Sequence, residues 1–112
     1  MSQSRIEVFE AMLKEQPEEV MIWYGLASEY FKLERWGDAS EALRHVTRLN
    51  ADYTAAYQML GTALKNQGDR ESACRVWTEG IEVATRTGAW KARQHMEALP
   101  ADADADPDFC SE

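Results

Sequence analysis

The chain has 112 residues and a net charge of −8 at pH 7, and 45% of its residues are hydrophobic. This length predicts one domain with a continuous apolar core, and no apolar run is long enough to indicate a spanning helix or a secretory leader. Nucleic acid needs a basic track to replace its counterions, and this acidic chain has none. We therefore expect a cytoplasmic protein that uses neither a membrane nor a nucleic acid.

The first predicted element is a helix over about residues 4–16. Ser4 and Glu7 have the spacing of a capping box, in which two side chains satisfy free amides at a helix start. Pro17 ends the run because it lacks a backbone donor and clashes with the preceding turn. Apolar residues recur on one face of this helix: Ile6, Phe9 and Leu13.

Helical periodicity continues through the rest of the chain up to residue 99. Further helices are predicted at about residues 18–33, 38–49 and 54–67, then after Asp69, and last at about 89–99. Gly68 ends the fourth helix because it tolerates the left-handed conformation, and Asp69 can cap the fifth. Pro100 is expected to end the sixth. The prediction is an all-α protein of about six helices.

Two segments of the chain carry the same pattern at a spacing of 34 residues. Trp23 falls on Tyr57, Leu26 on Leu60, Ala27 on Gly61, Tyr30 on Leu64, Ala39 on Ala73 and Leu43 on Trp77. Such a period means that each unit is too small to bury its own apolar face, so neighbouring units stack. Small residues recur in register, which predicts close helix crossings, above all at Gly61 in mid-helix.

This pattern resembles the tetratricopeptide repeat, whose signature is Trp-x2-Leu-Gly-x2-Tyr, Ala-x3-Phe and a closing Pro. The first copy here is Trp23-x2-Leu26-Ala27-x2-Tyr30, Ala39-x3-Leu43 and Ala51, and the second is Tyr57-x2-Leu60-Gly61-x2-Leu64, Ala73-x3-Trp77 and Thr85. Both copies lack the closing proline. The resemblance implies a right-handed α-solenoid domain over residues 1–99. Its parts are a half-repeat helix at about 4–16, repeats at 20–53 and 54–87, and a capping helix at 89–99.

The last segment, residues 100–112, is predicted to be a disordered acidic tail, since like charges repel and apolar residues are few. Asp102, Asp104 and Asp106 have the initial spacing of a calcium loop. Pro107 stands where that loop needs glycine, and the chain ends before the final glutamate. We therefore predict no calcium site.

In this family the concave groove is lined by certain positions of the first helix of each repeat. The resemblance assigns this role to Met21, Tyr24, Ser28, Phe31 and Lys32 in one repeat and to Ala55, Gln58, Thr62, Lys65 and Asn66 in the other. It thus implies a groove for a peptide or helix of a partner protein. Tyr24 and Phe31 can bury apolar area there, while Lys32 and Lys65 can pair with carboxylates.

Other interpretations of the same residues stay open. Tyr24 and Phe31 could instead be covered by a further helix, by the C-terminal segment or by a second copy in a homodimer, and a client-specific chaperone is a third interpretation. Catalysis is not predicted, because His45 and His95 stand on different predicted helices without a motif. The two cysteines are separated by 35 residues, which matches no zinc site. No metal or cofactor is therefore expected.

Overall fold

The computed structural model describes residues 2–102, with side chains for residues 5–97. This part of the chain consists of six α-helices and contains no strand, which confirms the predicted all-α repeat fold. The helices are α1 Ser2–Glu15, α2 Val20–Lys32, α3 Trp36–Leu49, α4 Thr54–Asn66, α5 Arg70–Thr87 and α6 Trp90–Asp102. Each lies within a few residues of its predicted position.

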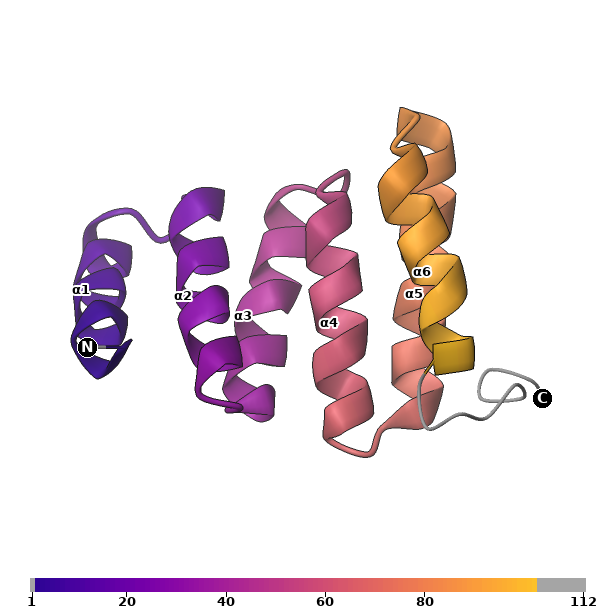
Figure 1. Cartoon of the computed structure of the whole chain (residues 1–112). Helices are drawn as coiled ribbons and strands as arrows, with labels where there is room; N and C mark the ends of the chain where they lie inside the picture. The colour runs from indigo at the N-terminus through magenta and orange to yellow at the C-terminus, as the bar shows by residue number, and fades with distance from the viewer. Residues whose placement is uncertain (1, 103–112) are drawn as a thin grey trace.

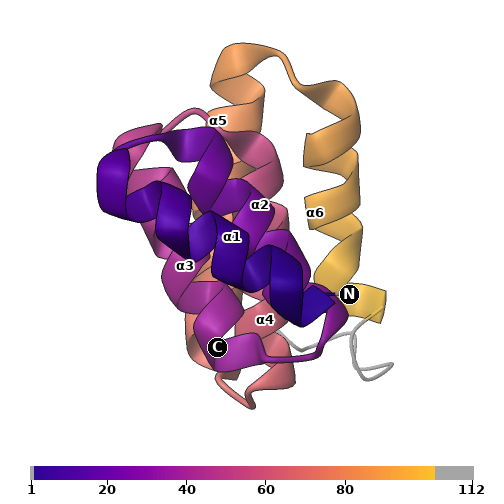
Figure 2. The same cartoon turned by 90° about the vertical axis from the view of Figure 1, so that its left-hand side faces the viewer.

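Helices α1 to α5 follow one another across Figure 1 in chain order, α6 lies in front of α5, and each helix packs against the next. In addition, α4 contacts α6. The described part measures 42 × 28 × 20 Å, so the stack is elongated. Figure 2 looks along it from the α1 end, where α1 lies across the front. Within residues 2–102, no helix covers the outer side of α1, and Val8 of this helix is 58% exposed.

The 34-residue repeat is visible in individual hydrogen bonds. The indole Nε1 of Trp23 donates to the carbonyl oxygen of Pro17 at 2.8 Å. The hydroxyl of Tyr57 donates to the carbonyl oxygen of Ala51, also at 2.8 Å. Each bond ties the first helix of a repeat to the turn before it and satisfies a carbonyl that no helix uses. The two repeats thus share contacts as well as a sequence pattern.

Trp77 on α5 lies at the centre of the larger apolar cluster and is 1% exposed. Its indole packs directly against Gly61 of α4, where an added Cβ would overlap the ring. The predicted close approach at Gly61 is therefore confirmed. The principal residues of this cluster are Leu43, Val46, Tyr57, Leu60, Val83 and Met96. A second cluster joins α1 to α2, α3 and α4 through Ile6, Leu26, Tyr30, Ala39 and Ala63.

The predicted helix ends are mostly confirmed. Gly68 has φ +87° after α4, and the Asp69 side chain accepts a hydrogen bond from the Ser72 amide at 3.2 Å at the start of α5. Two predictions are wrong. α1 begins at Ser2, so Ser4 lies inside the helix and cannot cap it.

The second wrong prediction concerns Pro100, which does not end the sixth helix, since α6 runs to Asp102. A proline lacks only its own backbone N–H donor. The helix can therefore continue past it for a few residues. Residues 101 and 102 of the predicted tail are therefore helical. The remainder of that tail, residues 103–112, lies outside the described part of the chain.

Candidate functional site

The predicted groove residues lie on the first helix of each repeat, α2 and α4. We call the following set the α2–α4 face: Met21, Tyr24, Ser28, Phe31, Lys32, Gln58, Thr62, Lys65 and Asn66. Spacings of three, four and seven residues put members of one helix on the same side of it. α3 packs against both helices, and Ala63 of α4 belongs to the same apolar cluster as Leu26 and Tyr30 of α2.

Exposure differs along the α2–α4 face. Met21, Lys32 and Asn66 are exposed, and Met21 is 61% accessible although it is apolar. The half-buried members are Tyr24, Ser28, Phe31, Gln58, Thr62 and Lys65. No acidic group of the described chain pairs with Lys65, whereas Lys32 is held by a neighbour on its own helix. The face therefore offers apolar contact at one end and free amine and amide groups at the other.

The serine and threonine hydroxyls on this face already donate hydrogen bonds within their own helices. Ser28 Oγ donates to the carbonyl oxygen of Tyr24 at 3.1 Å, and Thr62 Oγ1 donates to that of Gln58 at 3.0 Å. These two bonds occupy the same place in the two repeats, 34 residues apart. Each of these two hydroxyls donates its proton to a carbonyl of its own helix, so it can only accept a hydrogen bond from a ligand.

Tyr24 forms an aromatic patch with Tyr53, the residue just before α4. Its ring lies 5.0 Å from that of Tyr53, between centroids, at an interplanar angle of 38°. The hydroxyl of Tyr53 reaches Met21 Sδ at 3.9 Å. Burial raises the pKa of Tyr24 above its usual value, and the neighbouring Tyr53 adds to the shift. Met21, Tyr24 and Tyr53 form one surface, which we call the Tyr24 patch.

Phe31 is not part of this patch. Its ring packs edge-on against Trp36 at 4.8 Å and 81°, and both rings cover the cluster that joins α1 to α2. Seven residues of helix separate it from Tyr24, a rise of about 10 Å. The structure therefore gives Phe31 a packing role inside the repeat and leaves it half-buried, so the two predicted aromatics do not form one continuous surface.

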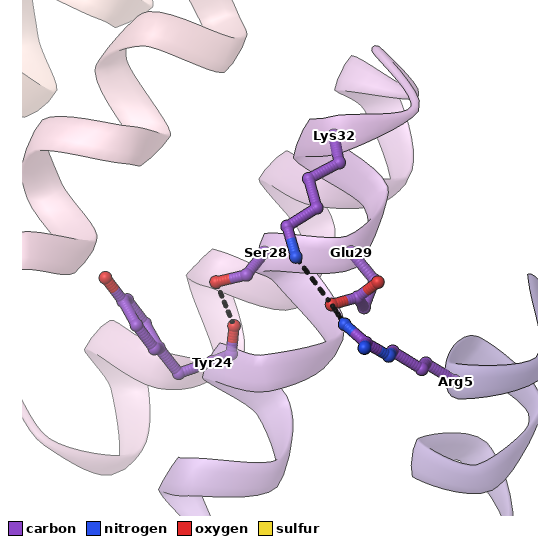
Figure 3. Close-up of polar contacts among 5 residues, drawn as sticks. All are labelled: Arg5, Tyr24, Ser28, Glu29 and Lys32. Carbon is purple, nitrogen blue, oxygen red and sulfur yellow. Dashed lines mark hydrogen bonds and ion pairs between the residues drawn. The ribbon is translucent and has the colours of Figure 1, made fainter. Parts of the chain in front are cut away.

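Sequence reasoning missed a buried carboxylate beside this face, on Glu29 of α2, which is 5% exposed. Its Oε2 accepts from Lys32 Nζ at 3.2 Å and lies 3.8 Å from Arg5 Nη1 of α1, as Figure 3 shows. No donor of the described chain reaches Oε1. The sequence gives one signal of this burial: Glu29 is a charged residue between Ser28 and Tyr30 on a largely apolar helix. Glu29 fixes both cations at the edge of the α2–α4 face.

His45 lies on α3 and His95 on α6, which share no helix contact of note. Among the described side chains, no three His, Cys, Asp or Glu residues form a group that could hold a metal ion.

Within residues 2–102, no helix is both long and apolar enough to span a bilayer.

Two sequence similarities decide the family of this chain. The sequence model of the tetratricopeptide repeat matches residues 6–73, more than half of the chain. The TPR repeat-containing protein PA0015 of Pseudomonas aeruginosa is 30% identical over 94 residues, covering 81% of this chain and 87% of that protein. The chain belongs to the tetratricopeptide repeat family.

A solved structure agrees in fold with this tetratricopeptide repeat protein. The solution structure of protein BPP2914 from Bordetella parapertussis superposes with a TM-score of 0.78, covering 95% of this chain and 91% of that chain, at 24% identity. Tetratricopeptide repeats generally mediate protein–protein interactions, and proteins of the family are typically non-catalytic adaptor modules. The predicted family resemblance is thus confirmed.

Proposed function

We propose that this protein is a non-catalytic adaptor that binds a peptide or helix of another protein along the α2–α4 face, in the cytoplasm. The observation that carries the proposal is the Tyr24 patch, where an exposed Met21 extends a tyrosine pair. Aromatic and methionine side chains are enriched at protein interfaces, and rings held in place lose little entropy when a partner binds. Lys65 and Asn66 give the far end of the face its polar contacts.

Affinity capture from a lysate of the source organism tests this proposal with three baits. We expect the wild-type chain and the Val8→Lys variant to capture the same partner, and the Met21→Lys variant to lose it. Val8 is the matched control, because it is 58% exposed against 61% for Met21 and lies on α1. Equal capture by both variants, at unchanged helicity, would contradict the proposal. Phe31 is not a suitable target, because it packs on Trp36.

Self-association through the same face is the alternative, since an exposed methionine does not specify whether its partner is a second copy. Light scattering over a dilution series separates the two. A dimer that dissociates in the Met21→Lys variant favours self-association, whereas a monomer at every concentration rules it out.

A further inference from the structure

A cavity of about 290 Å³ lies between α1, α2 and α3. Its apolar walls come from Leu13, Trp23, Leu26 and Ala42. A space of this size is at the lower limit of small-molecule pockets, so it suits a single side chain better than a cofactor. On α2, Trp23 and Leu26 lie on a different side of the helix from Tyr24 and Ser28. The cavity is therefore separate from the α2–α4 face, and a ligand could occupy it whether or not a partner binds at that face.

Three carboxylates surround this apolar space: Glu10, Asp38 and Glu41. Glu10 accepts a hydrogen bond from the Tyr30 hydroxyl at 3.4 Å, which leaves its charge in place. Asp38 pairs with Arg35 at 2.8 Å. No lysine or arginine of the described chain pairs with Glu41. Among the ion pairs of the described chain, only that of Arg35 with Asp38 involves these carboxylates, so Glu10 and Glu41 form none there.

The neighbouring groups agree with a negative potential in the cavity. The pKa of Tyr30 is raised by burial first, and then by the charges of Glu10 and Asp38. His45 stacks on the Trp23 indole at 3.9 Å between ring centroids. Burial and the nearby Arg48 lower the pKa of this histidine, and the charge of Glu41 opposes that shift, so the imidazole adds no positive charge at pH 7.

We propose that this cavity binds the side chain of a lysine or arginine presented by a partner protein. The aliphatic stem lies along Leu13 and Leu26, and the cationic head lies beside Glu10 and Glu41. Long basic side chains bury an apolar stem and keep a charged head, which matches apolar walls with an acidic rim. The Trp23 ring in the wall adds an aromatic surface that favours cations.

The test is an NMR titration of the full chain, labelled with ¹⁵N, with three capped tripeptides, acetyl-Ala-X-Ala-amide. X is lysine, arginine or norleucine, which has a lysine-like stem without the charge. We expect the lysine or the arginine peptide to shift the amide signals of Leu13, Leu26 and Ala42, and to do so less at high salt. Norleucine binding equal to that of both basic peptides, or no shifts at all, would overturn the proposal.

Two double variants locate the binding charge. Glu10→Gln with Glu41→Gln should weaken binding of the basic peptide by roughly twofold to thirtyfold, as expected for two exposed charges. Glu71→Gln with Glu97→Gln makes the same change of net charge elsewhere and should leave the affinity unchanged. Equal weakening in both variants would show general attraction to an acidic protein and overturn the site.

Spermine is the last probe: binding of spermine at these residues without binding of either basic peptide would assign the cavity to free polyamines instead.

Discussion

Trp23 and Tyr57, 34 positions apart, make the same side-chain hydrogen bond, each to the carbonyl oxygen six residues before it and each at 2.8 Å. The acceptors are Pro17 and Ala51, which stand at the closing-proline position of the family signature. The backbone carbonyl of an alanine accepts a hydrogen bond as well as that of a proline does. The turn before each repeat is therefore held by the aromatic donor, which explains why a repeat without the closing proline still stacks.

Removal of one such donor should have a measurable cost. We expect Tyr57→Phe to lower the free energy of unfolding by about 1 kcal/mol, because a part-buried hydrogen bond is lost and the Ala51 carbonyl has no other donor in the described chain. Tyr53→Phe is the control, since that hydroxyl contacts only Met21 Sδ at 3.9 Å within the described chain. Urea unfolding of both variants measures the difference. Equal losses in the two would show that the Tyr57 bond contributes nothing specific.

The contact of Trp77 with Gly61 predicts a second result. Gly61→Ala places a methyl group inside the position of a rigid, buried ring. Overpacking costs about 1–3 kcal/mol, and the better helix propensity of alanine offsets up to about 1 kcal/mol. We therefore expect a net loss of about 1–2 kcal/mol by thermal or urea unfolding. Gly37→Ala is the control: its Cβ would meet Gln67 Nε2 at 3.5 Å, an ordinary contact, so it should not destabilise.

Glu29 is predicted to reduce stability rather than to increase it. A buried carboxylate loses its hydration, and here one of its oxygens gains no donor from the described chain. Its two cations, Arg5 and Lys32, are largely exposed, so both pairs are screened. Glu29→Met should raise the free energy of unfolding by about 1 kcal/mol, while Glu71→Met on the surface should change it by less than about 0.5 kcal/mol. A loss of stability in Glu29→Met would mean that the ion pairs outweigh the desolvation.

The cap of α5 should be sensitive to acid. Hydrogen bonds from Ser72, first from its side chain and then from its amide, lower the pKa of Asp69. The folded state therefore favours the carboxylate. The stability from this cap is complete above the unfolded pKa, near about 3.9, and is lost as the pH falls through the folded value. We expect Asp69→Ala to lower the melting temperature at pH 7, and the difference from wild type to shrink below about pH 3.9.

A second substitution checks the cause of that effect. Asp69→Asn keeps an acceptor for the Ser72 amide but cannot titrate. Its melting temperature should lie between those of the wild type and Asp69→Ala at pH 7. A gap between wild type and Asp69→Ala that stays constant from pH 7 to pH 2 would contradict the role of the carboxylate.

The fold can be predicted from the sequence because the same packing and turn requirements act in every repeat. Close crossings need small residues, which places Gly61 under a large ring, and a left-handed helix end needs glycine, as at Gly68. Such requirements recur at a fixed spacing and can be read without coordinates. The prediction at Pro100 is wrong because a proline near a helix end removes only one hydrogen bond, and the sequence alone does not say whether the helix continues.

The candidate site was only partly predictable. Helical spacing puts Tyr24 and Phe31 on one side of α2, but it does not show that Trp36, the first residue of α3, packs on Phe31. The ion pair of Glu29 with Arg5 joins residues 24 positions apart. The acidic cavity is lined by side chains from three helices. These features arise from tertiary packing of side chains that no local period specifies.

Site-specific photo-crosslinking can show whether a partner protein binds along the α2–α4 face. A benzophenone amino acid is placed in turn at Met21 and Asn66 on this face, and at Val8 and Glu71 away from it; all four side chains are exposed. We expect irradiation in a lysate to link the first two positions to one and the same protein and the other two to none. Crosslinks to that protein from Val8 or Glu71, with none from Met21 and Asn66, would contradict binding at this face.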